Sequence, residues 1–260
     1  MRCWVGEDHL ATASGKSGFA LHHRRDRAMI AATVFAIWMA MLVGFGIDVI
    51  NRAHAGHLTF PLIIHLHALA YTSWLALLVA QVWLVRTRRV AVHRKLGMAA
   101  LFLIPLMLVL GPAAVISQIT ATPDMPDRWI SWMSVQFTNA FGSAVLLAAG
   151  FLKRRDAASH KRLMLMGTIA VTEPGFGRIW LMPIWTRLGE GYIPFYFSAY
   201  IGTLILVLAV GAYDLATRRR LHPAYIGAAL WIFANEALAD WLFYQPFWLV
   251  WMKTLTGHPA

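Results

Sequence analysis

Two histidines lie in nearly identical basic sequence motifs, each at the start of a long apolar stretch. His93 is followed by Arg-Lys-Leu and His160 by Lys-Arg-Leu, 67 residues further along the chain. Two imidazoles on facing helices are the axial ligands of a bis-histidine b-type haem, and the neighbouring basic side chains would suit haem propionates. The same words would suit a phospholipid head group or another anion at two helix amino termini. A third reading is two interfacial histidines among topology-setting basic residues.

A second group of polar residues falls inside apolar stretches, where charged groups are costly and normally pair in a bundle interior. Its members are His65, His67, Glu173, Arg178, Glu236 and Asp240. Glu236 and Asp240, spaced i and i+4, share a helix face. Two acids in a low dielectric need a cation or a retained proton, and we expect Arg178 to be the counter-charge.

The two histidines of this group, His65 and His67, cannot share a helix face at a spacing of two, so at most one is expected to face the acids. A mixture of histidines and carboxylates would suit a divalent metal, but no compact ligand word such as HExxH is present, so no metal ligands are assigned. A structural ion-pair network, a substrate or proton site and a metal centre all stay open.

The composition indicates a membrane protein. Apolar residues make up 59% of the 260 residues and charged residues only 13%, with a mean hydropathy of +0.57, whereas soluble domains usually carry about 25% charge. The formal charge of +11 does not indicate a nucleic-acid partner, because the basic residues fall between apolar runs. A single cysteine, Cys3, excludes an internal disulfide framework.

Apolar runs of about 20 residues recur, each long enough to cross a hydrocarbon core about 30 Å thick as a helix. They predict an all-α, polytopic membrane protein with seven transmembrane helices. The predicted domains are a disordered cytoplasmic tail over 1–27, a membrane domain over 28–251 and a short outer tail over 252–260. The predicted spans are roughly 28–50, 59–85, 94–119, 128–152, 160–184, 193–216 and 223–251.

The distribution of Lys and Arg predicts the orientation. Of the 23 basic residues, about 18 fall in the tail and in the second, fourth and sixth loops, which places the amino terminus in the cytoplasm and the carboxyl terminus outside. Trp and Tyr gather at the opposite end. Most are expected to form an interfacial belt, with a minority lining a lipophilic pocket.

Spans 2–3 and 4–5 read as a duplicated hairpin, so we expect a four-helix core of two parallel repeats with His93 and His160 at matching depths. Both repeats carry helix breakers near their outer ends, Gly111-Pro112 in one and Glu173-Pro174 in the other. Breaks at corresponding places point to a binding site in a membrane fold, although a simple kink is equally compatible with the pattern.

Three histidine-containing motifs of this sequence resemble those of a family of uncharacterised seven-span bacterial inner-membrane proteins. The resemblance rests on the HxH word at His65 and His67, the HRKLG word from His93 and the HKRLM word from His160. It implies the same topology in a bacterial inner membrane and supplies no reaction. The word beginning at His93 also resembles the helix start of transmembrane b-type cytochromes, in which third- and fifth-span histidines share a haem.

Three functions follow as hypotheses. The first is haem- or quinone-linked electron transfer, with His93 and His160 as haem b ligands. The second is a transporter or lipid-binding protein whose broken spans form the site, with Glu236 or Asp240 carrying a proton and Arg178 meeting the substrate. The third is a membrane hydrolase whose metal is held by His65 or His67 and the acidic residues. All three imply contact with the lipid bilayer, and a quinone or small lipophilic ligand is a candidate partner.

Overall fold

The computed structural model describes residues 23–56 and 59–259, and within these ranges the chain is helical and contains no strand. Most of the predicted tail, residues 1–22 with Cys3, lies outside the described residues. The helices are α1 (Asp26–His54), α2 (Leu62–Arg86), α3 (Val90–Gly97), α4 (Ala100–Thr120), α5 (Asp127–Ser131), α6 (Met133–Leu152), α7 (Ala157–Val171), α8 (Glu173–Leu188), α9 (Tyr192–Arg218), α10 (Pro223–Phe243) and α11 (Pro246–Thr256).

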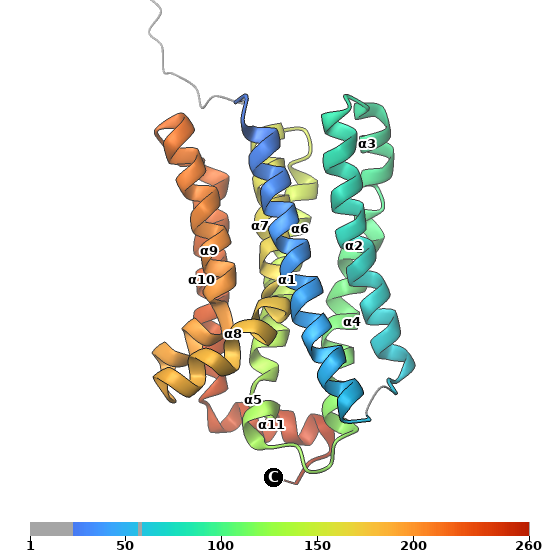
Figure 1. Cartoon of the computed structure of the whole chain (residues 1–260), viewed down its shortest axis with the longest axis vertical. Helices are drawn as coiled ribbons and strands as arrows, with labels where there is room; N and C mark the ends of the chain where they lie inside the picture. Colours follow the sequence, from blue (N-terminus) through green and yellow to red (C-terminus); the bar gives the residue numbers. More distant parts are fainter. Residues whose placement is uncertain (1–22, 57–58, 260) are drawn as a thin grey trace, which may run out of the picture.

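Most of these helices stand upright in one bundle (Figure 1). The turns at residues 86–90, 152–157 and 218–223 carry clusters of Arg and Lys and lie at one end, which we call the basic end. Helix α11 runs across the opposite end, which we call the α11 end. α11 continues to Thr256, so part of the segment predicted as an outer tail is helical.

Six stretches of the described chain are long and apolar enough to cross a membrane, by length and composition. They are Asp26–His54, Leu62–Arg86, Val90–Thr120, Asp127–Leu152, Tyr192–Arg218 and Pro223–Phe243. The predicted fifth span, 160–184, is not one continuous helix, because the chain divides there into α7 and α8 at Thr172. Seven uninterrupted spans are therefore not observed in the described residues.

The break between α7 and α8 has a local cause. Pro174 has no N–H to bond the carbonyl one turn earlier and its ring collides with that turn. α7 closes instead with a bond from the Thr172 N–H to the Ile169 carbonyl at 3.0 Å, while the Thr172 hydroxyl donates to the same oxygen. α8 then leaves the bundle direction and packs between α1 and α9 (Figure 1).

The matching break expected at Gly111-Pro112 is not found. α4 runs through Pro105 and Pro112 without ending, and the helical interruption in this span lies at Met98 and Ala99 instead. The Tyr71 hydroxyl of α2 donates to the Met107 carbonyl at 3.1 Å, in the turn before Pro112. This bond ties α2 to α4 beside the proline, while the carbonyl that Pro112 leaves without its helical donor is that of Leu108.

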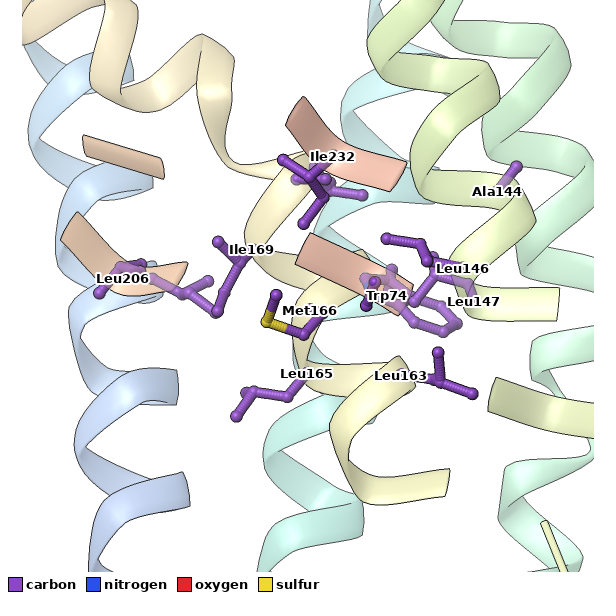
Figure 2. Close-up of a cluster of buried hydrophobic side chains, with 14 of the residues drawn as sticks. Trp74, Ala144, Leu146, Leu147, Leu163, Leu165, Met166, Ile169, Leu206 and Ile232 are labelled. Atoms are coloured by element: carbon purple, nitrogen blue, oxygen red, sulfur yellow. The ribbon is translucent and has the colours of Figure 1, made fainter. Parts of the chain in front are cut away.

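The main apolar core lies where α2, α4, α6 and α7 meet, with α10 packed on α6 and α7. α2 packs on α4, α4 on α6, and α6 on α7. Figure 2 shows the centre of this core, where Trp74 of α2 lies among Leu146, Leu147 and Leu163, and Met166 and Ile169 of α7 lie beside it. Helices α2, α4, α6 and α7 thus form a contiguous packed set, while the predicted duplication of two hairpins stays a prediction.

Candidate functional sites

His93 of α3 and His160 of α7 face each other at the basic end of the bundle. Their ring centroids are 6.3 Å apart and their planes cross at 81°. Each lies in the first turn of its helix and is half-buried. The packing of α6 between α4 and α7 brings these two helix starts together although they are 67 residues apart in sequence.

Each of the two rings also has a second contact through Nδ1. His160 Nδ1 is 2.8 Å from the Gly150 carbonyl oxygen of α6, which can only accept, so this nitrogen is the donor. His93 Nδ1 lies against the side-chain amide of Gln81 in α2. An amide supplies an acceptor or a donor there according to its orientation. Both contacts fix the ring orientation and leave Nε2 for another partner.

The basic residues that follow the two histidines have different surroundings. Arg94 and Lys95 are exposed. Lys161 donates to Asp26 of α1 at 2.7 Å, and Arg162 donates to both carboxylate oxygens of Asp214 in α9, at 2.7 and 2.6 Å. Only the motif that begins at His93 therefore exposes the Arg and Lys that follow its histidine.

Lys161 and Arg162 belong to a buried ionic cluster that ties α1, α7 and α9 together. Arg218 bridges its two acids, bonding Asp26 at 2.7 and 2.8 Å and Asp214 at 3.2 Å. The side chains of Arg162, Asp214 and Arg218 are 5%, 1% and 1% exposed. Sequence reasoning missed this cluster, because it assigned the basic residues to topology, haem propionates or an external anion and did not pair them with acids of other helices. The available clue was two acids near the basic ends of apolar helices.

Two carboxyls of the other predicted site, Glu173 and Glu236, line a small cavity between α6, α8, α9 and α10. Glu173, 2% exposed, accepts from Asn139 Nδ2 at 3.4 Å. Glu236, 6% exposed, accepts from the Tyr196 hydroxyl at 2.7 Å. Asp240 follows one turn later on α10 and is also buried. The three acids thus lie in one region, and among the described residues the hydrogen-bond partners of Glu173 and Glu236 are an amide and a hydroxyl rather than basic side chains.

The remaining members of the predicted site lie elsewhere. Arg178 of α8 turns to α1, where its guanidinium lies 4.0 Å from the Phe45 ring centroid and its Nε is 3.8 Å from Asp48. The described residues contain no ion pair between Arg178 and Glu236 or Asp240. The side chain that was expected to neutralise these two acids contacts α1 instead. His65 is exposed with its ring edge-on to Phe60.

His67 points to a different side of α2, as a spacing of two requires. Its ring packs on Tyr71 with centroids 4.3 Å apart, and its Nδ1 is buried without a hydrogen-bond partner in the part of the chain that the structure describes. Neither histidine hydrogen-bonds to Glu173, Glu236 or Asp240 in the described structure. Across residues 23–56 and 59–259, no group of three or more His, Cys, Asp or Glu is placed to hold a metal ion.

Aromatic side chains at the α11 end are divided between core and surface. Trp132 and Phe195 are buried together, with ring centroids 5.0 Å apart, and Trp248 of α11 donates to the Ser131 carbonyl at 3.0 Å. Trp180 and Trp251 are exposed. Trp248 thus attaches α11 to α5, and Trp132 and Phe195 pack the α5–α6 junction against α9. The exposed tryptophans are placed as belt residues would be.

Comparison with known proteins adds no assignment: no protein-family model, curated protein or solved structure matches this chain with significant similarity.

Proposed function

We propose that this protein is an electron-transfer protein of the bacterial inner membrane that holds one b-type haem between His93 and His160. The observation that carries the proposal is the opposition of two imidazoles at 6.3 Å. Two imidazoles on opposite sides of one metal ion, with metal–nitrogen bonds of about 2 Å, have their centroids roughly 6 Å apart. The contacts of both rings through Nδ1 leave Nε2 of each ring as the nitrogen that would bind the haem iron.

The number of ligands favours haem over a bare metal ion. A protein-bound transition metal takes three or four protein ligands, whereas a haem brings four nitrogens of its own and needs two axial side chains. The Gly150 carbonyl and the Gln81 amide would hold the axial imidazoles in place, as outer-shell partners do at metal sites. Arg94 and Lys95 are exposed beside His93 and would pair with propionates. When bound, the haem supplies one-electron chemistry.

The alternative that the motifs at His93 and His160 bind a phospholipid head group or another anion has less support. It needs basic side chains at both helix starts, yet Lys161 and Arg162 are engaged by Asp26 and Asp214. The hydrolase alternative has less support too, because His65 is turned away toward Phe60 and no group of three ligands gathers in the described residues.

For the topology, we propose that α7 and α8 together make a seventh, discontinuous crossing, so that the basic end lies in the cytoplasm and the α11 end outside. The concentration of Lys and Arg at the basic end supports this orientation. The histidine pair would then lie near the cytoplasmic surface. A membrane quinone is the proposed electron partner, because it would diffuse in the same lipid phase.

The test is an absorption spectrum of detergent-purified protein expressed with sufficient haem precursor. We expect a Soret band that shifts on reduction, about one haem per chain, and its loss in both His93→Ala and His160→Ala. His65→Ala, an exposed histidine toward the other end of α2, is the matched control and should keep the haem. Reduction by a quinol analogue then tests the partner.

Two results would overturn the haem proposal. One is a colourless wild-type preparation that is folded by circular dichroism and monodisperse on size exclusion. The other is an unchanged haem content in both histidine variants.

A further inference from the structure

The cavity beside Glu173 is built to hold a single small polar molecule. Its volume is about 20 Å³, which is room for about one water molecule. Glu173 and Asn139 line it from α8 and α6, and Tyr200 and Thr203 line it from α9. The site lies at the break between α7 and α8, well inside the bundle.

Two hydroxyls on the wall of this cavity have no partner. Tyr200 is 3% exposed and Thr203 is 2% exposed, and neither hydroxyl makes a hydrogen bond in the part of the chain that the structure describes. Buried polar groups are nearly always satisfied, often by ordered water. One water could accept from both hydroxyls and donate to Glu173 and Asn139, which uses all four of its hydrogen-bonding positions.

The charges around Glu173 require a positive partner for its carboxylate. The groups that face it are Asn139 from α6, Tyr200 from α9 and Glu236 from α10. The nearest base on its own helix, Arg178, interacts electrostatically with Glu173 but does not hydrogen-bond to it, and its Nε lies 3.8 Å from Asp48 of α1. A buried carboxylate whose neighbouring cation is shared with a second acid favours holding a proton or recruiting an ion.

Side chains that carry oxygen atoms extend from this cavity toward the α11 end. The rings of Tyr200 and Tyr196 lie with centroids 5.4 Å apart and planes inclined by 54°, and the Tyr196 hydroxyl donates to Glu236 at 2.7 Å. Asp240, one turn further along α10, is about 6 Å nearer that end. Its Oδ1 is buried and has no partner among the described residues.

We propose that Glu173 is a proton-loading group supplied from the α11 end through Asp240, Glu236, Tyr196, Tyr200 and one water. In each hop an O–H bond forms on the acceptor oxygen as one breaks on the donor. The net result is one proton added to the Glu173 carboxylate and one taken from bulk water. The ligand of the site is therefore water and its proton, and this inference does not depend on haem binding.

Infrared difference spectroscopy of the purified protein in lipid vesicles, titrated with pH, tests this proposal. We expect a carbonyl stretching band from a protonated carboxyl that is lost in Glu173→Gln and shifted in Thr203→Val, which removes one hydroxyl bound to the water. Glu190→Gln is the control, because Glu190 is exposed in the α8–α9 turn. On transfer to D₂O, Tyr196→Phe and Asp240→Asn should slow deuterium uptake by the band without removing it.

Three outcomes would overturn the proposal: a band unchanged in Glu173→Gln, deuterium uptake as fast in the two path variants as in the wild type, or loss of the band on replacing K⁺ by Na⁺ at constant pH. The last would make the cavity a cation site. Circular dichroism of each variant separates these results from misfolding.

Discussion

Trp74 of α2 donates its indole N–H to the hydroxyl of Thr168 in α7 at 3.2 Å, inside the main apolar core. This bond joins the first hairpin of the core directly to the second. Trp74 lies on the same side of α2 as Gln81, which contacts His93. Thr168 lies on α7 about two turns beyond His160. The alignment of α2 with α7, and therefore the spacing of the two imidazoles, depends on this packing.

Trp74→Phe tests that role. The ring is largely kept, but one buried hydrogen bond and part of the indole are lost, so we expect a destabilisation of about 1–2 kcal/mol. Trp83→Phe is the control, because Trp83 is exposed on the same helix and should change stability little. Thermal unfolding in detergent measures both, and equal melting temperatures for the two variants would contradict the prediction.

From the buried ionic cluster we expect Asp214→Ala to lower the free energy of unfolding by a large amount. Arg162 would lose its bidentate partner while its side chain stays 5% exposed, and breaking a buried pair from one side typically costs about 3–5 kcal/mol. The double variant Arg162→Met with Asp214→Leu should recover much of the loss, because neither charge then stays buried. Denaturant unfolding in mixed micelles is the measurement.

Asp124→Ala, in the exposed α4–α5 turn, is the control for the ionic cluster. A double variant no more stable than Asp214→Ala alone would show that the pair is not the source of the loss.

The contact of α1 with α8 depends on two glycines. A Cβ atom on Gly44 would collide with the Gly175 carbonyl, which is backbone and cannot rotate away, whereas a Cβ on Gly46 meets nothing within 4 Å. Gly44→Ala should therefore cost about 1–3 kcal/mol, and Gly46→Ala, two residues further along the same helix, should be neutral or slightly stabilising. Melting temperatures of the two variants, compared side by side, decide this; a neutral Gly44→Ala would mean that α8 does not seat against α1.

Asp156 predicts a pH-dependent stability for the start of α7. Its carboxylate caps the helix by accepting from the Ala158 and Ser159 N–H groups at 3.0 and 3.3 Å. The hydrogen bond from the Ser159 hydroxyl, with these backbone bonds, lowers the pKa of the carboxyl below its ordinary value of 3.8. The stabilisation is therefore complete above the unfolded-state pKa and is lost as the pH falls through the lower folded-state value.

Asp156→Ala should cost about 1 kcal/mol at neutral pH, and its melting temperature should converge on that of the wild type in acid. Asp156→Asn keeps an N-cap without the charge and should lose less, with a flatter pH dependence. A gap between wild type and Asp156→Ala that stays constant down to the acid limit would contradict a role for the carboxylate charge.

The helical membrane character of the chain followed from local sequence. In lipid each spanning segment has to satisfy its own backbone hydrogen bonds, so apolar length alone identifies such helices, and six of the described stretches agree with that criterion. Glu173-Pro174 was read correctly as a break. Gly111-Pro112 was not a break: α4 continues through Pro112, and the Tyr71 hydroxyl of α2 bonds the Met107 carbonyl beside it, a contact that no local pattern contains.

Sequence by itself determined the helices, the basic end and the placing of His93 and His160 at equal distances from their helix starts, since these depend only on residue type and position along one helix. Only the tertiary structure decided which way each helix faces, because a rotation of one residue is about 100° and is fixed by packing against neighbours. That packing turned His93 and His160 toward each other, sent Arg178 to Asp48 instead of Glu236, and joined Arg162 to Asp214, 52 residues away.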